Sequence, residues 1–178
     1  GNHRVLGMIP KTFLPNYSEY YEQRWFASGA SVNETEVHDA LGTFHIRVDQ
    51  LFRLGDALVG AEICEDLWAP VNPGTHAALA GSNIVCNLSA SNELVSKADY
   101  REDLVRMTSA KSFCAYVYAG AGVMESTKDV VFGGHCLVAE AGQLLAQSKR
   151  FELSPQAVIG DVDLQRLQHD RAQNTTFA

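Results

Sequence analysis

The stretch that determines the fold reads Val59-Gly60-Ala61-Glu62-Ile63-Cys64-Glu65-Asp66-Leu67-Trp68. An apolar run of this length that ends at a turn predicts a buried strand, here over residues 57–63. Cys64 follows directly, where the chain turns away from the strand. Such a position suits a nucleophile, because the strand fixes the backbone and the turn presents the side chain. The alternative is a small buried hydrophobic residue, since free cysteines are among the most buried residues.

Composition predicts one soluble globular domain spanning residues 1–178, with no internal boundary. Of its 178 residues, 46% are hydrophobic and 20% are charged, which is ordinary for this class. The net charge of -7 argues against a nucleic-acid partner, which would need a basic face. The longest near-apolar run, residues 114–124, is too short to cross a bilayer, so no membrane association is expected. The first residues do not open a signal peptide, and we expect a cytoplasmic protein.

The four cysteines of the chain show no pattern typical of a metal site. None are paired as C-x-x-C, and no histidine lies at zinc-finger spacing from them, so no metal is predicted. Cys86, Cys114 and Cys136 are predicted to be core residues with free thiols in a reducing compartment. Two disulfides in a secreted protein are the alternative, which only the even count favours.

Buried strands alternate with helices along the chain, and antiparallel hairpins are inserted between them. This pattern predicts an α/β layered fold with a mixed sheet. The clearest helix is predicted over residues 99–113, where acids lie in the first turns. The remaining predictions are a short helix over residues 21–26 capped by Ser18, a loop over 27–43, one strand over 44–54, a strand over 157–162 and a helix over 163–172 capped by Asp163.

Lys11 directly follows a short strand that is stopped by Pro10. A lysine near Cys64 would lower the pKa of the thiol, and its ammonium could stabilise the oxyanion of a tetrahedral intermediate. Glu22 lies eleven residues after Lys11 and could approach it across the short helix. These three residue types predict acyl chemistry at a thiolate.

Five motifs of this chain resemble those of a known family. Residues 11–22 (KTFLPNYSEYYE) and 60–68 (GAEICEDLW) are similar to the lysine and cysteine motifs of the nitrilase, or carbon–nitrogen hydrolase, superfamily. Residues 87–91 (NLSAS), 116–122 (YVYAGAG) and 125–129 (ESTKD) resemble its glutaminase domains of glutamine-dependent NAD+ synthetases. The resemblance covers essentially the whole chain in the right order.

The resemblance implies a nitrilase-type α-β-β-α sandwich with mixed sheets and a Glu-Lys-Cys triad. Cys64 matches the nucleophile and Lys11 the triad lysine. Glu22 matches a second glutamate, which supports the lysine. The triad glutamate of this family lies upstream of the lysine, and no residue of this chain matches it. We therefore expect the chain to be an N-terminally incomplete carbon–nitrogen hydrolase domain.

The resemblance also implies the substrate. Tyr17, Ser91 and Lys97 match positions that hold glutamine, with Lys97 suited to its α-carboxylate, and the backbone N–H of Glu65 would be an oxyanion donor. Glutamine would be hydrolysed through a cysteine thioester, and ammonia would pass to an ATP-dependent synthetase domain of the same protein.

Cofactors are expected only for that synthetase domain. No Gly-rich ATP loop occurs in these residues, so ATP, magnesium and deamido-NAD would belong to the synthetase domain and none to this one. The resemblance further implies a homo-oligomer.

Three other readings remain open. His135 could pair with Cys64 in a Cys-His hydrolase, although the residues around Cys64 fit the lysine-based family better. A standalone amidase or nitrilase acting on another amide would share the fold and chemistry. A chain without the triad glutamate could also be a catalytically incomplete scaffold or subunit.

Overall fold

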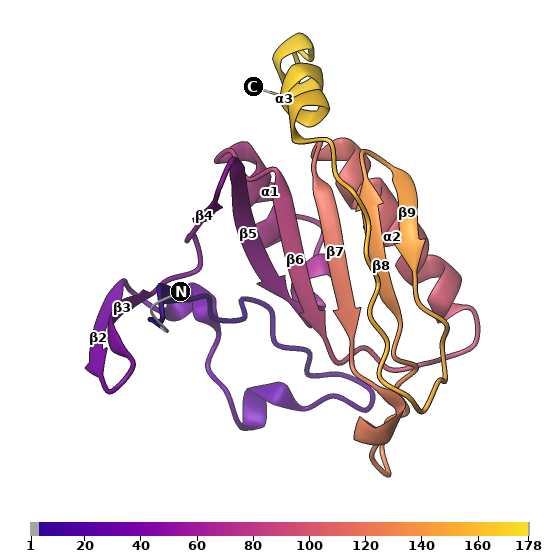
Figure 1. The fold of residues 1–178 in the computed structure, drawn as a ribbon. Coiled ribbons are helices and arrows are strands. Elements are labelled where there is room, and N and C mark those ends of the chain that lie inside the picture. The colour runs from indigo at the N-terminus through magenta and orange to yellow at the C-terminus, as the bar shows by residue number, and fades with distance from the viewer. Residues whose placement is uncertain (1–3, 178) are drawn as a thin grey trace.

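The computed structural model describes residues 4–177, and a six-stranded mixed sheet is its largest element (Figure 1). Its strand order is β4-β5-β6-β7-β8-β9. The three central strands β5, β6 and β7 run parallel, and the outer strands pair antiparallel to their neighbours. The bounds are β4 (Phe52–Leu54), β5 (Ala57–Ile63), β6 (Ile84–Ser89), β7 (Ala115–Gly120), β8 (Cys136–Glu140) and β9 (Gln143–Gln147).

Two helices, α1 (Pro73–Leu79) and α2 (Lys97–Lys111), are the crossovers between the parallel strands and contact the same sheet. Asn72 caps α1 by accepting a hydrogen bond from the backbone N–H of Thr75, and Pro73 occupies the first turn, where its missing N–H costs nothing. The buried core lies between these helices and the sheet. It comprises Leu67, Val85, Val105, Cys114, Tyr116, Tyr118, Leu137 and Ala139.

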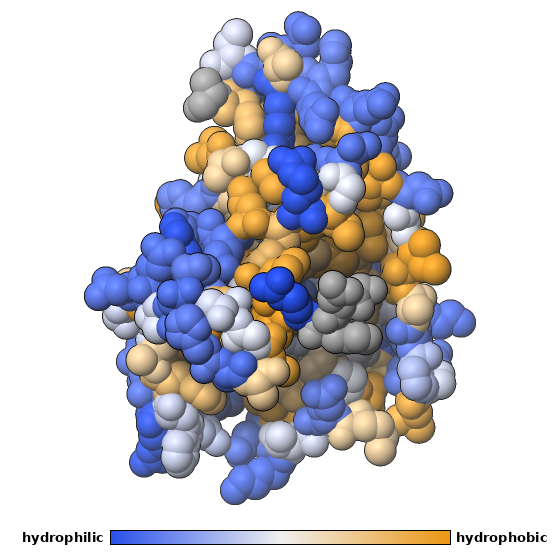
Figure 2. All heavy atoms as spheres, turned by 60° about the vertical axis from the view of Figure 1, so that its left-hand side comes forward, coloured by the Kyte–Doolittle hydropathy of each residue, from blue (hydrophilic) through white to orange (hydrophobic). Residues whose placement is uncertain are grey.

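A second, three-stranded sheet has the order β1-β3-β2, with β1 (Gly7–Met8) parallel to β3 (Gly42–Ile46) and β2 (Thr35–Asp39) antiparallel to it. Figure 1 shows this small sheet beside the β4 edge of the large one. Figure 2 shows hydrophobic side chains gathered in the hollow at the centre of the face turned forward there. Large apolar residues are uncovered, as with Leu88 at 67% exposure on β6.

The remaining elements are one helix and four short 3-10 turns. They are α3 (Leu164–Gln173), η1 (Glu22–Arg24), η2 (Gly29–Ser31), η3 (Cys64–Trp68) and η4 (Val123–Glu125). Helix α3 extends beyond one end of the sheet in Figure 1. It is held there by the buried side chain of Leu167 and by Arg171, whose guanidinium donates to the carbonyl oxygens of Ser82, Phe113 and Ser112.

The structure confirms the mixed α/β fold and the central pattern of strands and helices predicted from the sequence. The strand that ends at Cys64 is β5, with the predicted bounds. The predicted helix over residues 99–113 is α2, which begins two residues earlier, at Lys97. Asp163 caps α3 as predicted, since its side chain accepts from the backbone N–H of Arg166 at 2.9 Å. No helix among the described residues is long and apolar enough to cross a membrane.

Several local predictions were wrong. The loop over residues 27–43 contains β2, which the sequence pattern conceals because that strand is exposed on both faces and shows no alternation. The single strand over 44–54 is two strands, β3 and β4, which belong to different sheets. Residues 157–162 belong to no strand, although Gly160 packs against Val138 of β8. Ser18 caps no helix, because η1 begins only at Glu22.

Candidate active site

Cys64 lies at the carboxyl end of β5, at the start of η3, and its backbone is left-handed with φ of 51°. This conformation is uncommon for a residue with a side chain, and it turns the chain sharply out of the strand. Cys64 is only 7% exposed, yet it contributes to the wall of a cavity of about 500 Å³. The other residues that line this cavity are Pro15, Tyr17, Ser18, Glu19, Tyr20, Glu65, Trp68, Ser91, Leu94, Val95, Ser96, Lys97 and Tyr100.

Asp66 joins the turn after Cys64 to the segment after Lys11. Its buried carboxylate accepts backbone hydrogen bonds from Phe13 at 2.7 Å, Thr12 at 3.1 Å and Ile63 at 2.9 Å. Burial raises the pKa of Asp66, and the backbone donors and Lys11 oppose that rise. The sequence showed Asp66 only as one of two acids after the cysteine, and its linking role could not be read from that pattern.

Lys11 and Glu22 form the ion pair that the sequence suggested. The Nζ atom of Lys11 donates to Oε2 of Glu22 at 2.5 Å, and both side chains are largely buried, at 14% and 27% exposure. Neither residue is among those that line the Cys64 cavity. Asp66 nevertheless ties the backbone of the two residues after Lys11 to the turn that follows Cys64.

Glu65 and Tyr17 meet at one side of the cavity. The hydroxyl of Tyr17 donates to Oε1 of Glu65 at 2.6 Å. Burial, followed by this hydrogen bond to Glu65, raises the pKa of Tyr17. The Glu65 side chain is therefore oriented along the cavity wall, next to the nucleophile in the chain.

Ser91 and Lys97 lie on the wall formed by the loop after β6. Ser91 is 7% exposed, and its buried hydroxyl, which lies near the Tyr118 hydroxyl, makes no hydrogen bond of regular geometry with any described residue. The Lys97 ammonium donates to Oδ1 of Asn92 at 2.5 Å and lies 5.2 Å from the ring centre of Trp68. Burial, followed by the charge of Arg101, lowers the pKa of Lys97. Within residues 4–177, no carboxylate lies within ion-pair distance of this ammonium.

Asn92 is a site residue that sequence reasoning missed. Besides accepting from Lys97, its side chain accepts from the hydroxyl of Tyr20 at 2.9 Å and donates to Glu19. It is 3% exposed. The only sequence signal was its place in the run of small polar residues after a strand, which is equally typical of a plain loop.

His135 does not contact Cys64. Its Nδ1 atom lies 3.0 Å from Nη1 of Arg101, and its Nε2 atom lies 2.9 Å from Gln147. Burial and the Arg101 charge lower the pKa of His135 to about 4. Both ring nitrogens are therefore engaged away from the thiol, and the arrangement does not favour a Cys-His pair.

The other three cysteines are free thiols. Cys114 is fully buried, as predicted, whereas Cys86 and Cys136 are only partly buried, because each lies on the face of its strand opposite the helices. Within residues 4–177 no group of three or more metal-ligating side chains is present.

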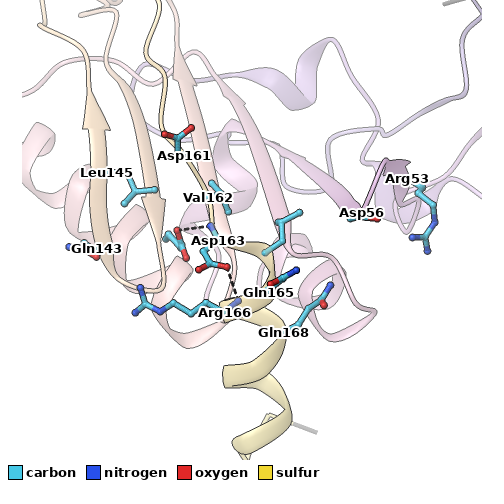
Figure 3. Close-up of a pocket in the computed structure, with 12 residues that line it drawn as sticks. Arg53, Asp56, Gln143, Leu145, Asp161, Val162, Asp163, Gln165, Arg166 and Gln168 are labelled. Carbon is cyan, nitrogen blue, oxygen red and sulfur yellow. Dashed lines mark hydrogen bonds between the residues drawn. The ribbon is translucent and has the colours of Figure 1, made fainter.

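A larger cavity, of about 830 Å³, lies elsewhere (Figure 3). It is lined by Arg53 of β4, by Asp56 in the turn between β4 and β5, by Gln143 at the β8–β9 turn and by Arg166 of α3. Since Cys64 follows the opposite end of β5, this cavity is separate from the thiol. Its lining mixes acidic and basic side chains.

Comparisons with known proteins place these features in a family. The carbon-nitrogen hydrolase family profile matches residues 3–172. The chain is 39% identical, over 97% of its length, to a glutamine-dependent NAD(+) synthetase of Mycobacterium leprae, and 29% identical to that of Homo sapiens. It spans about a quarter of these relatives, 26% in both cases.

Solved structures agree on the fold. A glutamine-dependent NAD(+) synthetase from Cytophaga hutchinsonii superposes with a TM-score of 0.75 at 30% identity, covering 87% of this chain and 25% of that one. A carbon-nitrogen hydrolase from Helicobacter pylori gives 0.69 at 19% identity, covering 94% of this chain and 55% of that one. With its family profile, its relatives and its mixed-sheet fold in agreement, this chain belongs to the carbon-nitrogen hydrolase family.

Proposed function

We propose that this chain supplies the nucleophile, Cys64, and the substrate-binding wall of a site that hydrolyses the side-chain amide of glutamine. The observation that carries the proposal is the wall of the Cys64 cavity. There the half-buried Lys97 ammonium has a neutral amide as its partner, and the buried Ser91 hydroxyl has none. A half-buried cation with no directly bound carboxylate favours an anionic ligand group, although the charges of Glu19 and Glu65 also act on Lys97. An amino-acid α-carboxylate would supply that group. The names of the relatives support glutamine as that amino acid.

The proposed chemistry begins at the thiol. Cys64 as a thiolate attacks the amide carbon, so that a C–S bond forms and the carbonyl oxygen becomes an oxyanion. The Lys11 ammonium and the Glu65 N–H stabilise that oxyanion. The C–N bond then breaks as the amide nitrogen takes up a proton and leaves as ammonia. Water next attacks the thioester, the C–S bond breaks, and glutamate and the free Cys64 thiol are formed. The proton donor would be the triad glutamate that the family resemblance places upstream of Lys11.

Glu22 has a supporting role in this scheme. Its carboxylate holds the Lys11 ammonium at 2.5 Å, which orients the lysine. Tyr17 would orient Glu65 and contact the substrate, since it lines the same cavity as Lys97.

The wider activity is proposed from the relatives. Ammonia would be used by an NAD+ synthetase domain of the same protein, which would bind ATP, magnesium and deamido-NAD. We expect the full-length protein to be a cytoplasmic homo-oligomer.

Ammonia release from glutamine by the natural full-length protein tests the proposal. Wild type should release ammonia and Cys64→Ala should not, while a simple amide such as butyramide should be a poor substrate. Equal rates for the two amides would point to a general amidase, and no hydrolysis of either by a folded protein would support a non-catalytic scaffold.

A further inference from the structure

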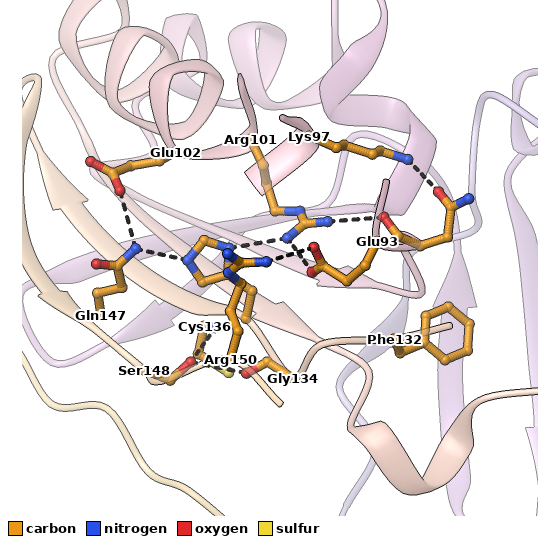
Figure 4. A network of polar contacts seen from close by, with 12 residues as sticks. Glu93, Lys97, Arg101, Glu102, Phe132, Gly134, Cys136, Gln147, Ser148 and Arg150 are labelled. Atoms are coloured by element: carbon orange, nitrogen blue, oxygen red, sulfur yellow. Dashed lines mark hydrogen bonds and ion pairs between the residues drawn. The ribbon is translucent and has the colours of Figure 1, made fainter. Parts of the chain in front are cut away.

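A buried polar network extends from the wall of the Cys64 cavity into the protein, and its centre is Arg101 (Figure 4). Arg101 is 1% exposed, which is rare for an arginine. Its Nη1 atom donates to Oε1 of Glu93 at 2.8 Å and lies 3.0 Å from His135, and its Nη2 atom donates to the backbone carbonyl of Asn92 at 3.1 Å. The guanidinium thus bonds to two consecutive residues of one loop.

That loop, residues 90–96, has no regular secondary structure, so tertiary contacts must determine its conformation. Glu93 supplies several of them. Its backbone N–H donates to the carbonyl of Val131 at 2.8 Å, and its second carboxylate oxygen accepts from Arg150 at 3.1 Å. At the end of the loop, Ser96 is held in a left-handed conformation with φ of 64°. The ion pairs of Glu93 therefore fix the middle of the loop on the side away from the cavity.

The same loop forms one wall of the Cys64 cavity. Ser91, Leu94, Val95 and Ser96 line it, as does Lys97, the first residue of α2. Lys97 and Arg101 are four residues apart on α2 and therefore project from the same side of the helix. Between them, the Asn92 side chain binds Lys97 and the Asn92 carbonyl binds Arg101. A displacement of Arg101 would therefore move Asn92, and with it the two side chains of this wall that would face a substrate, Ser91 and Lys97.

We infer that Arg101, neutralised by Glu93, is a positioning residue for the substrate-binding wall of the cavity. It contacts neither Cys64 nor the lysine–glutamate pair, so it acts on binding through the placement of Ser91, Asn92 and Lys97. This inference rests on the proposed function only for its kinetic readout, because the loop conformation can be measured without a substrate.

The test compares Arg101→Lys with Arg106→Lys in the full-length protein. Arg106 is the matched control, since it lies on the same helix with a side chain that is 42% exposed. Arg101→Lys keeps the charge but loses the forked geometry that reaches Glu93 and Asn92 together. We expect KM for glutamine to rise by at least about tenfold, as for a small displacement of positioning groups, with kcat changed by less than about threefold. Alkylation of Cys64 by iodoacetamide, a small neutral electrophile, should keep its wild-type rate.

Hydrogen–deuterium exchange is the second readout. Amides of residues 91–97 should exchange faster in Arg101→Lys than in wild type, and Arg106→Lys should match wild type. Glu93→Gln, which is isosteric, should change KM and exchange in the same direction, and it supplies the test if Arg101→Lys does not fold. Unchanged KM and unchanged loop exchange in a folded variant would overturn the inference. If wild type did not hydrolyse glutamine, the proposed function would fail, and the exchange comparison would still decide the positioning role.

Discussion

The carboxylate of Asp66 accepts a hydrogen bond from the backbone N–H of Phe13 at 2.7 Å. These residues are 53 positions apart in the chain. The bond joins the turn that follows Cys64 to the segment that follows Lys11. The relative position of Lys11 and Cys64 therefore depends on Asp66, which binds the backbone next to each of them. Asp66 itself has no role in bond making.

Replacing Asp66 with Asn tests this dependence. In the variant, one carboxylate oxygen is replaced by an amide NH2 group, which cannot accept a hydrogen bond. The backbone N–H of Thr12 or Ile63 then faces another donor and loses its partner. We expect the free energy of unfolding to fall by about 1–3 kcal/mol, as for an unsatisfied buried polar group. The rate of the proposed glutamine hydrolysis should fall by more than about tenfold, because a small displacement of Lys11 relative to Cys64 lowers the rate strongly. Denaturant unfolding and ammonia release measure the two effects.

Asp103→Asn is the control for that substitution, since its side chain is 71% exposed on α2. It should leave both quantities at wild-type values. A stable, fully active Asp66→Asn protein would show that the link to Phe13 is dispensable.

Lys11→Met should lower kcat by at least about 100-fold, because it removes a cation proposed to stabilise the oxyanion. Glu22→Gln should have a smaller effect, since it keeps the shape of the ion pair and removes only its charge. Steady-state kinetics should show kcat and kcat/KM falling together for Lys11→Met. Lys111→Met, at the exposed end of α2, is the matched control. A Lys11→Met protein with wild-type kcat would remove Lys11 from the proposed mechanism.

Lys97→Met should raise KM for glutamine by about 10- to 100-fold, because a hydrogen bond to a charged group contributes about 1.5–3 kcal/mol. Met is also a long, unbranched side chain, so kcat should change little. A parallel measurement with the α-carboxamide of glutamine separates binding of the carboxylate from other effects. If Lys97 binds that carboxylate, the substitution should barely affect the carboxamide; an equal loss for both substrates would place Lys97 in another role.

His135 should make the fold sensitive to mild acid. Its folded pKa of about 4 lies below its ordinary value of 6.5, so the unfolded chain gains a proton first as the pH falls. The neutral His135 imidazole contributes its full stabilisation above pH 6.5, the ordinary pKa that it has in the unfolded chain. This contribution, at most about 3 kcal/mol, is lost as the pH falls toward the pKa of about 4 that His135 has in the folded protein. Unfolding free energies of wild type and His135→Asn, measured between about pH 7 and pH 5, should show a shallower slope for the variant. Parallel slopes would contradict the burial of a neutral imidazole.

The central α/β pattern could be predicted because its signals are local. The apolar run before Cys64 predicted β5 with its correct bounds. Strand β2 could not be predicted, because it is polar and largely exposed and shows no alternation of apolar and polar residues. For the site, the Lys11–Glu22 pair followed from spacing and family motifs. Asn92 and Arg101 could not be found in this way, because their importance comes from contacts with loops and strands that are distant in the sequence.

The most direct test of the central claim is an intact-mass measurement after incubation with an electrophilic glutamine analogue. We expect one covalent adduct on the wild-type protein, mapped to Cys64 by peptide analysis and prevented by excess glutamine. We expect no adduct on Cys64→Ala, although that protein keeps three free cysteines. An adduct that persists in Cys64→Ala, or a wild-type protein that takes none, would contradict Cys64 as the nucleophile of a glutamine site.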